Sequence, residues 1–166
     1  MKTIKLDLFQ KMLYAGAKIL EIECQYINDL NVFPVPDGDT GSNMKTTTAG
    51  AIVAIKEAEI TNFSQLAKIF SRGLLMNARG NSGVILSQIF RGFMDALNND
   101  SDEVNIDQLK QAFNSAKDKA YASVSTPIEG TILTVIRVVK ERINEYDNFD
   151  SVEDLFAFAT KKQKSF

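Results

Sequence analysis

Two aspartates lie two residues apart in a stretch of the sequence that is rich in proline and glycine. Asp37 and Asp39 flank Gly38, and the segment 31–41 contains two prolines and two glycines. This composition forbids helix and predicts a fixed loop that is first extended and then turns. In an extended segment, residues two apart point to the same side, so both carboxylates would face one ligand. Mg²⁺ is commonly held by one or two carboxylates together with substrate phosphates.

The residues around this pair leave two interpretations open. Asn31 offers a neutral oxygen as a further metal ligand, and Asn43 could contact the metal or a phosphate. The alternative is that Pro36-Asp37-Gly38 is only a β-turn between two helices. An isolated motif of this kind favours the turn, whereas the second aspartate, the asparagines and the second glycine favour a metal site.

A second stretch of small residues precedes a predicted helix and consists of Gly80, Asn81, Ser82 and Gly83. Backbone amides at a helix N-terminus can bind phosphate oxygens, and the helix dipole adds to the attraction. Ser82 could cap the helix or donate to a phosphate, and an ordinary turn between helices explains the pattern equally well. The stretch is not a Walker A loop, since no Gly-Lys-Ser/Thr follows.

A third stretch, residues 127–134, again places a glycine before a helix start. Gly130 precedes Thr131, whose hydroxyl and amide could serve a nucleotide, although an ordinary helix cap is the simpler interpretation. Arg79, beside the second stretch, could stabilise phosphoryl charge. The alternative role is an ion pair on the surface or between helices. The two roles are equally favoured for Arg79, and the ion pair is favoured for Arg91, on the other side of the stretch.

The composition excludes several kinds of catalytic site. The 166 residues include no histidine and one cysteine. Ser-His-Asp triads, imidazole bases and histidine-ligated zinc are therefore absent. Cys24 can form no internal disulfide, and its place in an apolar helical pattern predicts a core position. Any bound metal must then be held by oxygens, which favours Mg²⁺.

Charge and hydropathy restrict the partners and the compartment. The net charge is −2, with no basic stripe to neutralise a phosphate backbone, so no nucleic acid partner is expected. The first residues lack a signal-peptide pattern, and the apolar runs are too short to cross a bilayer. We therefore expect a cytoplasmic chain without an integral membrane segment.

Apolar residues recur at spacings of three and four, so helices must position these stretches. Helices are predicted over 6–27 and 42–59, after the N-cap Ser64, after Gly83, and from the caps Asp107, Thr131 and Ser151. No segment shows sustained alternation with a period of two. Six or seven amphipathic helices with short links predict one all-α domain over residues 1–166, a bundle or barrel. Lys161–Lys164 is expected to form a solvated tail.

Residues 30–44, Leu-Asn-Val-Phe-Pro-Val-Pro-Asp-Gly-Asp-Thr-Gly-Ser-Asn-Met, closely resemble the metal-binding loop of the family that includes the L subunit of dihydroxyacetone kinase. The form Asn-Val-Phe-Pro-Val-Pro is similar to the ATP-binding subunit of bacterial fatty acid kinase. Residues 73–88 and 127–134 match the second and third motifs of that subgroup. The resemblance extends over about residues 6–155, with the motifs in the right order and spacing.

The resemblance implies an antiparallel helical barrel that binds ATP or ADP at one end. Asp37 and Asp39 would hold two Mg²⁺ ions that bridge to the phosphates, with Asn31 retained as a metal ligand in place of an aspartate. The second stretch would hold the phosphates, and Arg79 would act on the transferred group. The implied further nucleotide contacts are Thr40, Asn43, Met44, Gly130 and Thr131. The implied reaction is γ-phosphoryl transfer to a fatty acid carboxylate presented by a fatty-acid-binding carrier protein.

The resemblance also implies that the family's domain continues several tens of residues further, with a glycine-containing stretch at the site. We therefore expect a C-terminally incomplete barrel whose exposed apolar surface is covered by a homo-oligomer or another chain. Two other functions stay open. One is phosphorylation of dihydroxyacetone, which the Asn-Val-Phe-Pro-Val-Pro form argues against. The other is a non-catalytic nucleotide-binding module left by truncation; a scaffold without ligands leaves the three stretches unexplained.

Overall fold

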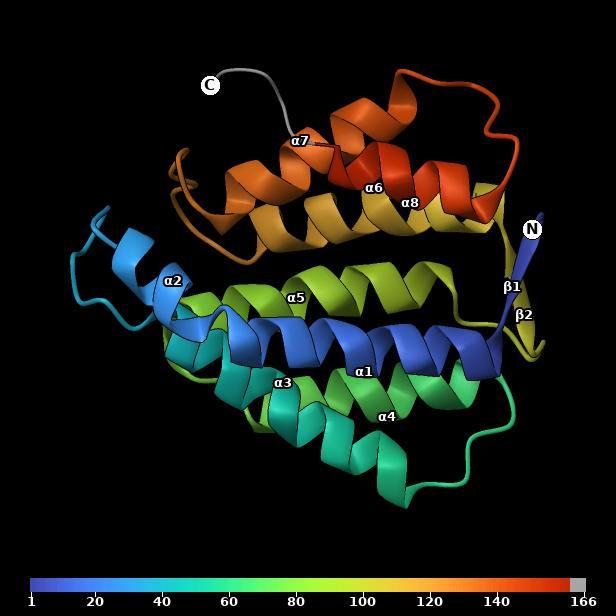
Figure 1. The fold of residues 1–166 in the computed structure, drawn as a ribbon, viewed down its shortest axis with the longest axis horizontal. Helices are drawn as coiled ribbons and strands as arrows, with labels where there is room; N and C mark the ends of the chain where they lie inside the picture. The colour runs from blue at the N-terminus through green and yellow to red at the C-terminus, as the bar shows by residue number, and fades with distance from the viewer. Residues whose placement is uncertain (162–166) are drawn as a thin grey trace.

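The computed structural model describes residues 1–161, and its long helices run antiparallel to their neighbours (Figure 1). The elements, in chain order, are β1 (Thr3–Lys5), α1 (Leu6–Ile22), α2 (Cys24–Leu30), α3 (Thr40–Glu57), α4 (Phe63–Met76), α5 (Gly80–Ala96), β2 (Glu103–Asn105), α6 (Ile106–Ala122), α7 (Ile132–Asn144) and α8 (Val152–Thr160). The predicted all-α class is confirmed, with one pair of three-residue strands added.

The helix predicted over residues 6–27 is divided in two at Glu23. This residue leaves helical geometry, with φ −90° and ψ 4°. Helix α2 then packs against the start of α3, where a Cβ on Gly41 would lie 2.1 Å from the carbonyl oxygen of Cys24. Cys24, predicted to lie in the core, is only half-buried. The described residues therefore form eight helices in place of the six or seven predicted.

The starts of the later helices depend on their N-caps. Thr131 caps α7 and Ser151 caps α8, as predicted. Helix α4 begins earlier than predicted, because its cap is Asn62 and not Ser64. The Asn62 side chain accepts a hydrogen bond from the amide of Gln65 at 2.8 Å. An N-cap needs an extended backbone and an oxygen near the third amide, and Asn62 provides both.

The strands β1 and β2 pair antiparallel beside the starts of α1 and α6, which the sequence did not predict. Ile4 pairs with Val104, and both side chains are buried. Strands of three residues are too short to show alternation with a period of two. Asn105, at the end of β2, forms a capping box with Gln108, so Asp107 lies in the first turn of α6 and does not cap it.

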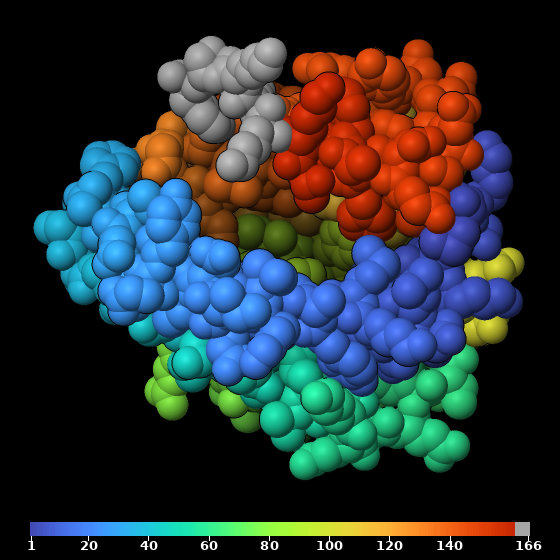
Figure 2. Space-filling view, viewed as in Figure 1, coloured from blue at the N-terminus to red at the C-terminus, as the bar shows by residue number. Residues whose placement is uncertain are grey.

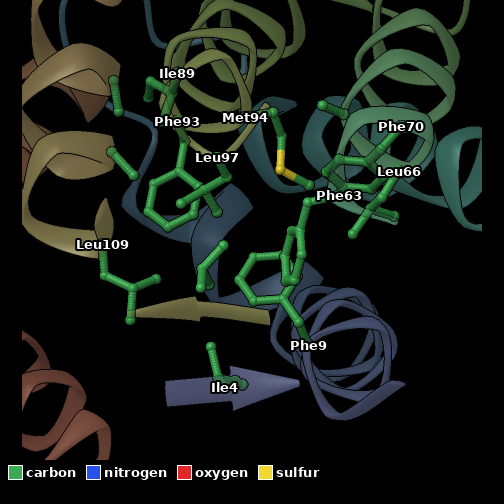
Figure 3. Close-up of a cluster of buried hydrophobic side chains, with 14 of the residues drawn as sticks. Ile4, Phe9, Phe63, Leu66, Phe70, Ile89, Phe93, Met94, Leu97 and Leu109 are labelled. Carbon is green, nitrogen blue, oxygen red and sulfur yellow. The ribbon is translucent and has the colours of Figure 1, made fainter. Parts of the chain in front are cut away.

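Apolar side chains from α1, α4, α5 and α6 meet in the core (Figure 3). The ring of Phe63 is fully buried and lies edge-on to Phe9, with 5.4 Å between the ring centroids. Phe9 also stacks on Phe93 of α5 at 6.2 Å. Helix α5 packs against α3, α4, α6 and α7, so it is the central element of the fold.

The helices leave one side of the molecule open. Figure 2 shows a hollow between α1 and α2, in blue, and α7 and α8, in orange and red, with α5 visible at its floor. Large apolar side chains of these helices are exposed, including Ile22 on α1 and Val135 on α7. No helix among the described residues has the length and apolar composition needed to cross a bilayer. Of the predicted solvated tail, Lys161 is exposed and residues 162–164 lie outside the described range.

Candidate functional site

The three stretches that carry the predicted chemistry lie at one end of the helices. The loop 31–39 leads into α3, residues 79–83 begin α5, and residues 127–131 lead into α7 (Figure 1). Because neighbouring helices run in opposite directions, the N-termini of α3, α5 and α7 share this end, and β1 and β2 lie at the other. The fold therefore gathers three separate motifs into one region.

Asn31 shapes the loop that carries the two aspartates. Its Oδ1 accepts hydrogen bonds from the amides of Asp39, at 3.0 Å, and Thr40, at 3.2 Å. Its Nδ2 donates to the carbonyl oxygen of Val35 at 3.0 Å. Both lone pairs of the amide oxygen are thus used by the backbone. Direct metal coordination by this oxygen would require the loss of one of these hydrogen bonds.

The carboxylates of Asp37 and Asp39 are exposed and form no ion pair with any other described residue. Gly38 lies between them in the left-handed region, at φ 62°. Among residues 1–161, no group of three or more Asp, Glu, His or Cys side chains is arranged to hold a metal. A cation here would therefore be held by two carboxylates and by oxygens of a ligand, which is the pattern typical of Mg²⁺ sites.

Asn28 holds the start of α3 from the side of α2, a role that the sequence motifs do not single out. Its Oδ1 accepts from the amide of Ser42 at 3.0 Å, and its Nδ2 donates to the Ser42 hydroxyl at 2.9 Å. Asn28 lies in the last turn of α2 and Asn31 directly follows that helix, so both are near the loop that leads into α3. The amides of Thr40 and Ser42 are therefore satisfied by side chains.

The start of α5 is built differently. Its N-cap residue, Arg79, provides no side-chain hydrogen bond. The amides of Gly80, Asn81 and Ser82 have no hydrogen-bond partner within residues 1–161. Unpaired amides at a helix N-terminus, together with the helix dipole, form a site for an anion. Ser82 does not cap this helix, because the helix already begins at Gly80.

Helix α5 begins in direct contact with α3. Gly80 has φ 64°, and a Cβ on it would lie 2.3 Å from Nδ2 of Asn43. A Cβ on Gly83 would lie 2.4 Å from Oγ1 of Thr47, which also accepts from the amide of Arg79 at 3.1 Å. Thr47 is fully buried and was not predicted as a site residue. Its position one helical turn after Asn43 is the signal that could have identified it.

Neither arginine near the second stretch forms the ion pair considered from the sequence, as far as the described residues go. Both side chains are exposed. Arg79 directly precedes α5, whereas Arg91 lies about 16 Å further along the helix axis. Only Arg79 is therefore at the end of the fold where the three stretches meet. Met44, in the first turns of α3, is half-buried at the same end.

Gly130 and Thr131 form the turn before α7, with Gly130 at φ 81°. The Thr131 hydroxyl donates to the carbonyl oxygen of Ile128 at 2.8 Å and accepts from the amide of Leu133 at 3.3 Å. It therefore acts as the ordinary helix cap that the sequence allowed. A Cβ on Gly130 would lie 3.7 Å from the ring of Phe33, so this turn packs against the loop that carries the aspartates.

Glu129, one residue before this turn, is held by donors from two helices and was not predicted. It accepts hydrogen bonds from the hydroxyls of Thr134 and Tyr121 and from the guanidinium of Arg137. The bond from Thr134, followed by those from Tyr121 and Arg137, lowers the pKa of Glu129 to about 2. Tyr121 and Arg137 are each eight residues away, one on either side, and Thr134 is five residues away. This separation hides the cluster from a search for short motifs.

Surface shape alone does not identify this region. One pocket is lined by residues that include Lys2, Asn105 and Phe149, and another by residues that include Tyr146 and Phe158. Neither contains a residue of the three stretches. The candidate site is defined by unpaired amides and exposed carboxylates, which an anion and a cation would bind together.

The helical fold defines an all-α domain, and the match to a family model indicates a nucleotide-binding, kinase-related type. The chain belongs to the DAK2 domain family, whose model matches residues 34–165. This match includes both aspartates, the start of α5 and the turn before α7.

The chain is similar to longer bacterial proteins. It is 42% identical over 168 residues to an uncharacterized protein of Mycoplasma genitalium, covering 97% of this chain and 30% of that protein. Identity is 44% over 163 residues with its Mycoplasma pneumoniae homolog, covering 94% of this chain and 29% of that protein. Identity is 41% over 152 residues with an uncharacterized protein of Staphylococcus haemolyticus, covering 91% of this chain and 27% of that protein. The chain thus spans less than a third of these relatives, and the predicted closeness to fatty acid kinase stays a prediction.

Proposed function

We propose that the chain is the Mg²⁺- and ATP-binding module of a kinase that transfers the γ-phosphoryl group to a fatty acid carboxylate on a carrier protein. One observation carries this proposal. The unpaired amides at the start of α5 lie at the same end of the fold as the exposed carboxylates before α3. Such amides suit phosphate oxygens, and such carboxylates suit the cations that accompany them.

The residues divide the binding of the nucleotide between them. The amides of Gly80, Asn81 and Ser82 bind phosphate oxygens, and Arg79 beside them offers a positive charge to the transferred group. Asp37 and Asp39 hold one or two Mg²⁺ ions. When bound, Mg²⁺ neutralises phosphate charge, which is the main requirement of phosphoryl transfer. Further nucleotide contacts come from Thr40, Asn43, Met44, Gly83, Gly130 and Thr131.

The transfer needs no protein nucleophile. An oxygen of the acceptor carboxylate forms a bond to the γ-phosphorus as the bond to the ADP oxygen breaks, giving an acyl phosphate and ADP. A sequence without histidine is compatible with this chemistry. The chain spans less than a third of the length of its relatives, so the acceptor and the carrier protein are proposals that go beyond this domain. Dihydroxyacetone, offered in place of the fatty acid, tests the alternative acceptor.

The first test is a calorimetric titration of ADP into the chain with and without Mg²⁺. We expect binding that depends on Mg²⁺ and is lost in the variant Asp37→Ala/Asp39→Ala. The matched control is Asp100→Ala/Asp102→Ala, which removes two carboxylates of the same spacing near β2. Binding that survives in the first variant, or that is lost equally in the control, would contradict the assigned metal site. A folded wild-type chain that binds no ADP would refute the proposal.

A further inference from the structure

Four hydrogen bonds tie the carboxylate of Glu129 to two helices. Its Oε1 accepts from the Tyr121 hydroxyl on α6 at 2.8 Å. Its Oε2 accepts from the Thr134 hydroxyl and from Nε and Nη2 of Arg137 on α7, the last two at 3.4 Å and 3.2 Å. Arg137 is also held by both carboxylate oxygens of Glu141, at 3.1 Å and 3.0 Å. An exposed ion pair by itself contributes little to stability. The hydroxyl groups of Tyr121 and Thr134 are therefore the partners that give this carboxylate a structural role.

Thr134 connects this carboxylate to the turn before α7. The amide of Gly130 donates to Oγ1 of Thr134 at 2.7 Å, and the same hydroxyl donates to Glu129. A hydroxyl has one proton and two lone pairs. Because the Thr134 hydroxyl directs its proton to Glu129, a lone pair of its oxygen is left to accept the hydrogen bond from the Gly130 amide. The carboxylate thereby orients the hydroxyl that holds Gly130 at φ 81°.

The position of this turn affects both the α7 end and the loop that carries the aspartates. The amides of Thr131 and Ile132 have no hydrogen-bond partner within the described range, so they can serve a ligand. Gly130 packs against the ring of Phe33. A displaced turn would move these amides and release Phe33. Arg137 meanwhile balances the charge of Glu129, which would otherwise repel an anion near this end.

We infer that Glu129 is a positioning residue that acts through Thr134 to hold the Gly130–Thr131 turn in its nucleotide-binding conformation. This inference rests on the proposed function. Glu129 itself need not touch the nucleotide. Its role is to keep backbone amides in place, and Arg137 supports it from the next turn of α7.

The test compares Glu129→Ala, Thr134→Val and the double variant. Thr134→Val keeps the shape of the side chain and removes only the hydroxyl. The matched control is Glu141→Ala, which removes the other partner of Arg137 and leaves the contacts of the turn intact. Two quantities are measured: the Kd of ADP with Mg²⁺ by calorimetry, and the hydrogen-exchange rate of the Gly130 amide by NMR without nucleotide.

We expect each single variant to weaken binding by about tenfold, the effect of losing one good hydrogen bond. The double variant should be no more than about twofold weaker than either, because residues that act in one chain are not additive. Gly130 should exchange faster in all three variants and at the wild-type rate in Glu141→Ala. Wild-type affinity in Glu129→Ala, or single effects that multiply to about a hundredfold in the double variant, would overturn the inference.

The exchange measurement separates this inference from the proposed function. If the wild-type chain binds no ADP, the proposed function fails and the exchange rates alone decide the role of Glu129. Faster exchange of Gly130 in both single variants would then support its positioning role. An unchanged rate in a folded Glu129→Ala or Thr134→Val chain would overturn that role. Thr134→Val serves this purpose even if Glu129→Ala does not fold.

Discussion

Asn28 and Asn31 accept hydrogen bonds from the amides of Ser42, Asp39 and Thr40 around the start of α3. At the start of α5 the amide of Arg79 donates to Thr47, but the amides of Gly80, Asn81 and Ser82 have no such partner among residues 1–161. Amides that donate to side chains are not free for a ligand, whereas unpaired amides at a helix N-terminus can bind an anion. The loop before α3 is therefore suited to present carboxylates, and the start of α5 is suited to bind phosphate.

The lowered pKa of Glu129 predicts how stability depends on pH. Folding favours the charged carboxylate, since its pKa falls from 4.5 to about 2. The resulting stabilisation is complete above pH 4.5 and is lost as the pH falls towards 2. We expect urea unfolding measured across this range to show a smaller loss of stability in Glu129→Gln than in the wild type. Equal pH dependence in the two chains would contradict the hydrogen-bonded state of this carboxylate.

Helices α3, α5 and α7 are each separated by one intervening helix, α4 or α6. Since short links reverse the chain direction, one intervening helix returns the next start to the same end of the fold. This alternation brings together motifs that are about forty to fifty residues apart in the sequence. It also places β1 and β2 at the opposite end, where they join the starts of α1 and α6.

Two glycines inside helices predict opposite effects of alanine. A Cβ on Gly92 of α5 would lie 2.3 Å from the carbonyl oxygen of Ser115 on α6, so Gly92→Ala should cost about 1–3 kcal/mol. A Cβ on Gly16 of α1 would meet nothing within 4 Å, so Gly16→Ala should stabilise by about 0.5–1 kcal/mol. Urea unfolding of the two variants measures both effects. A Gly92→Ala chain as stable as the wild type would contradict the close packing of α5 on α6, and a destabilised Gly16→Ala chain would contradict the open surroundings of Gly16.

The whole molecule combines a well-packed core with one open side. Phe63 and Leu109 are fully buried, and Phe9 links α1 to α4 and α5 through ring contacts. The hollow of Figure 2 lies between α1–α2 and α7–α8. The partner chain or oligomer predicted to cover apolar surface stays a prediction.

Truncation of the core should affect the entire fold. Phe63→Ala removes a side chain that is 0% exposed, and it should cost about 3–5 kcal/mol. The stability of a domain is about 5–15 kcal/mol, so the loss is a large part of the total. Leu75→Ala, on the same helix at 53% exposure, is the control and should change stability by less than about 1 kcal/mol. Urea unfolding checks both, and equal losses would place Phe63 outside the core.

The sequence alone was sufficient to predict the helical class, the three stretches and the caps Thr131 and Ser151. Helical periodicity and capping are local, so they can be read from neighbouring residues. The residue types within the stretches also indicated a cation beside an anion. The match of the DAK2 model to residues 34–165 agrees with the family that the motifs resemble.

Only the tertiary structure decided which polar groups at the site form hydrogen bonds within the chain. Thr47 accepts from the amide of Arg79, which is 32 residues away, and Glu129 accepts from Tyr121 and Arg137, which are each eight residues away. The division of α1 from α2 and the pairing of β1 with β2 likewise depend on distant segments. A hydrogen-bonding side chain has many possible partners in an unfolded chain. Helix packing selects one, and that choice satisfies the amides of Thr40 and Ser42 at the start of α3 and leaves those of Gly80, Asn81 and Ser82 unpaired among the described residues.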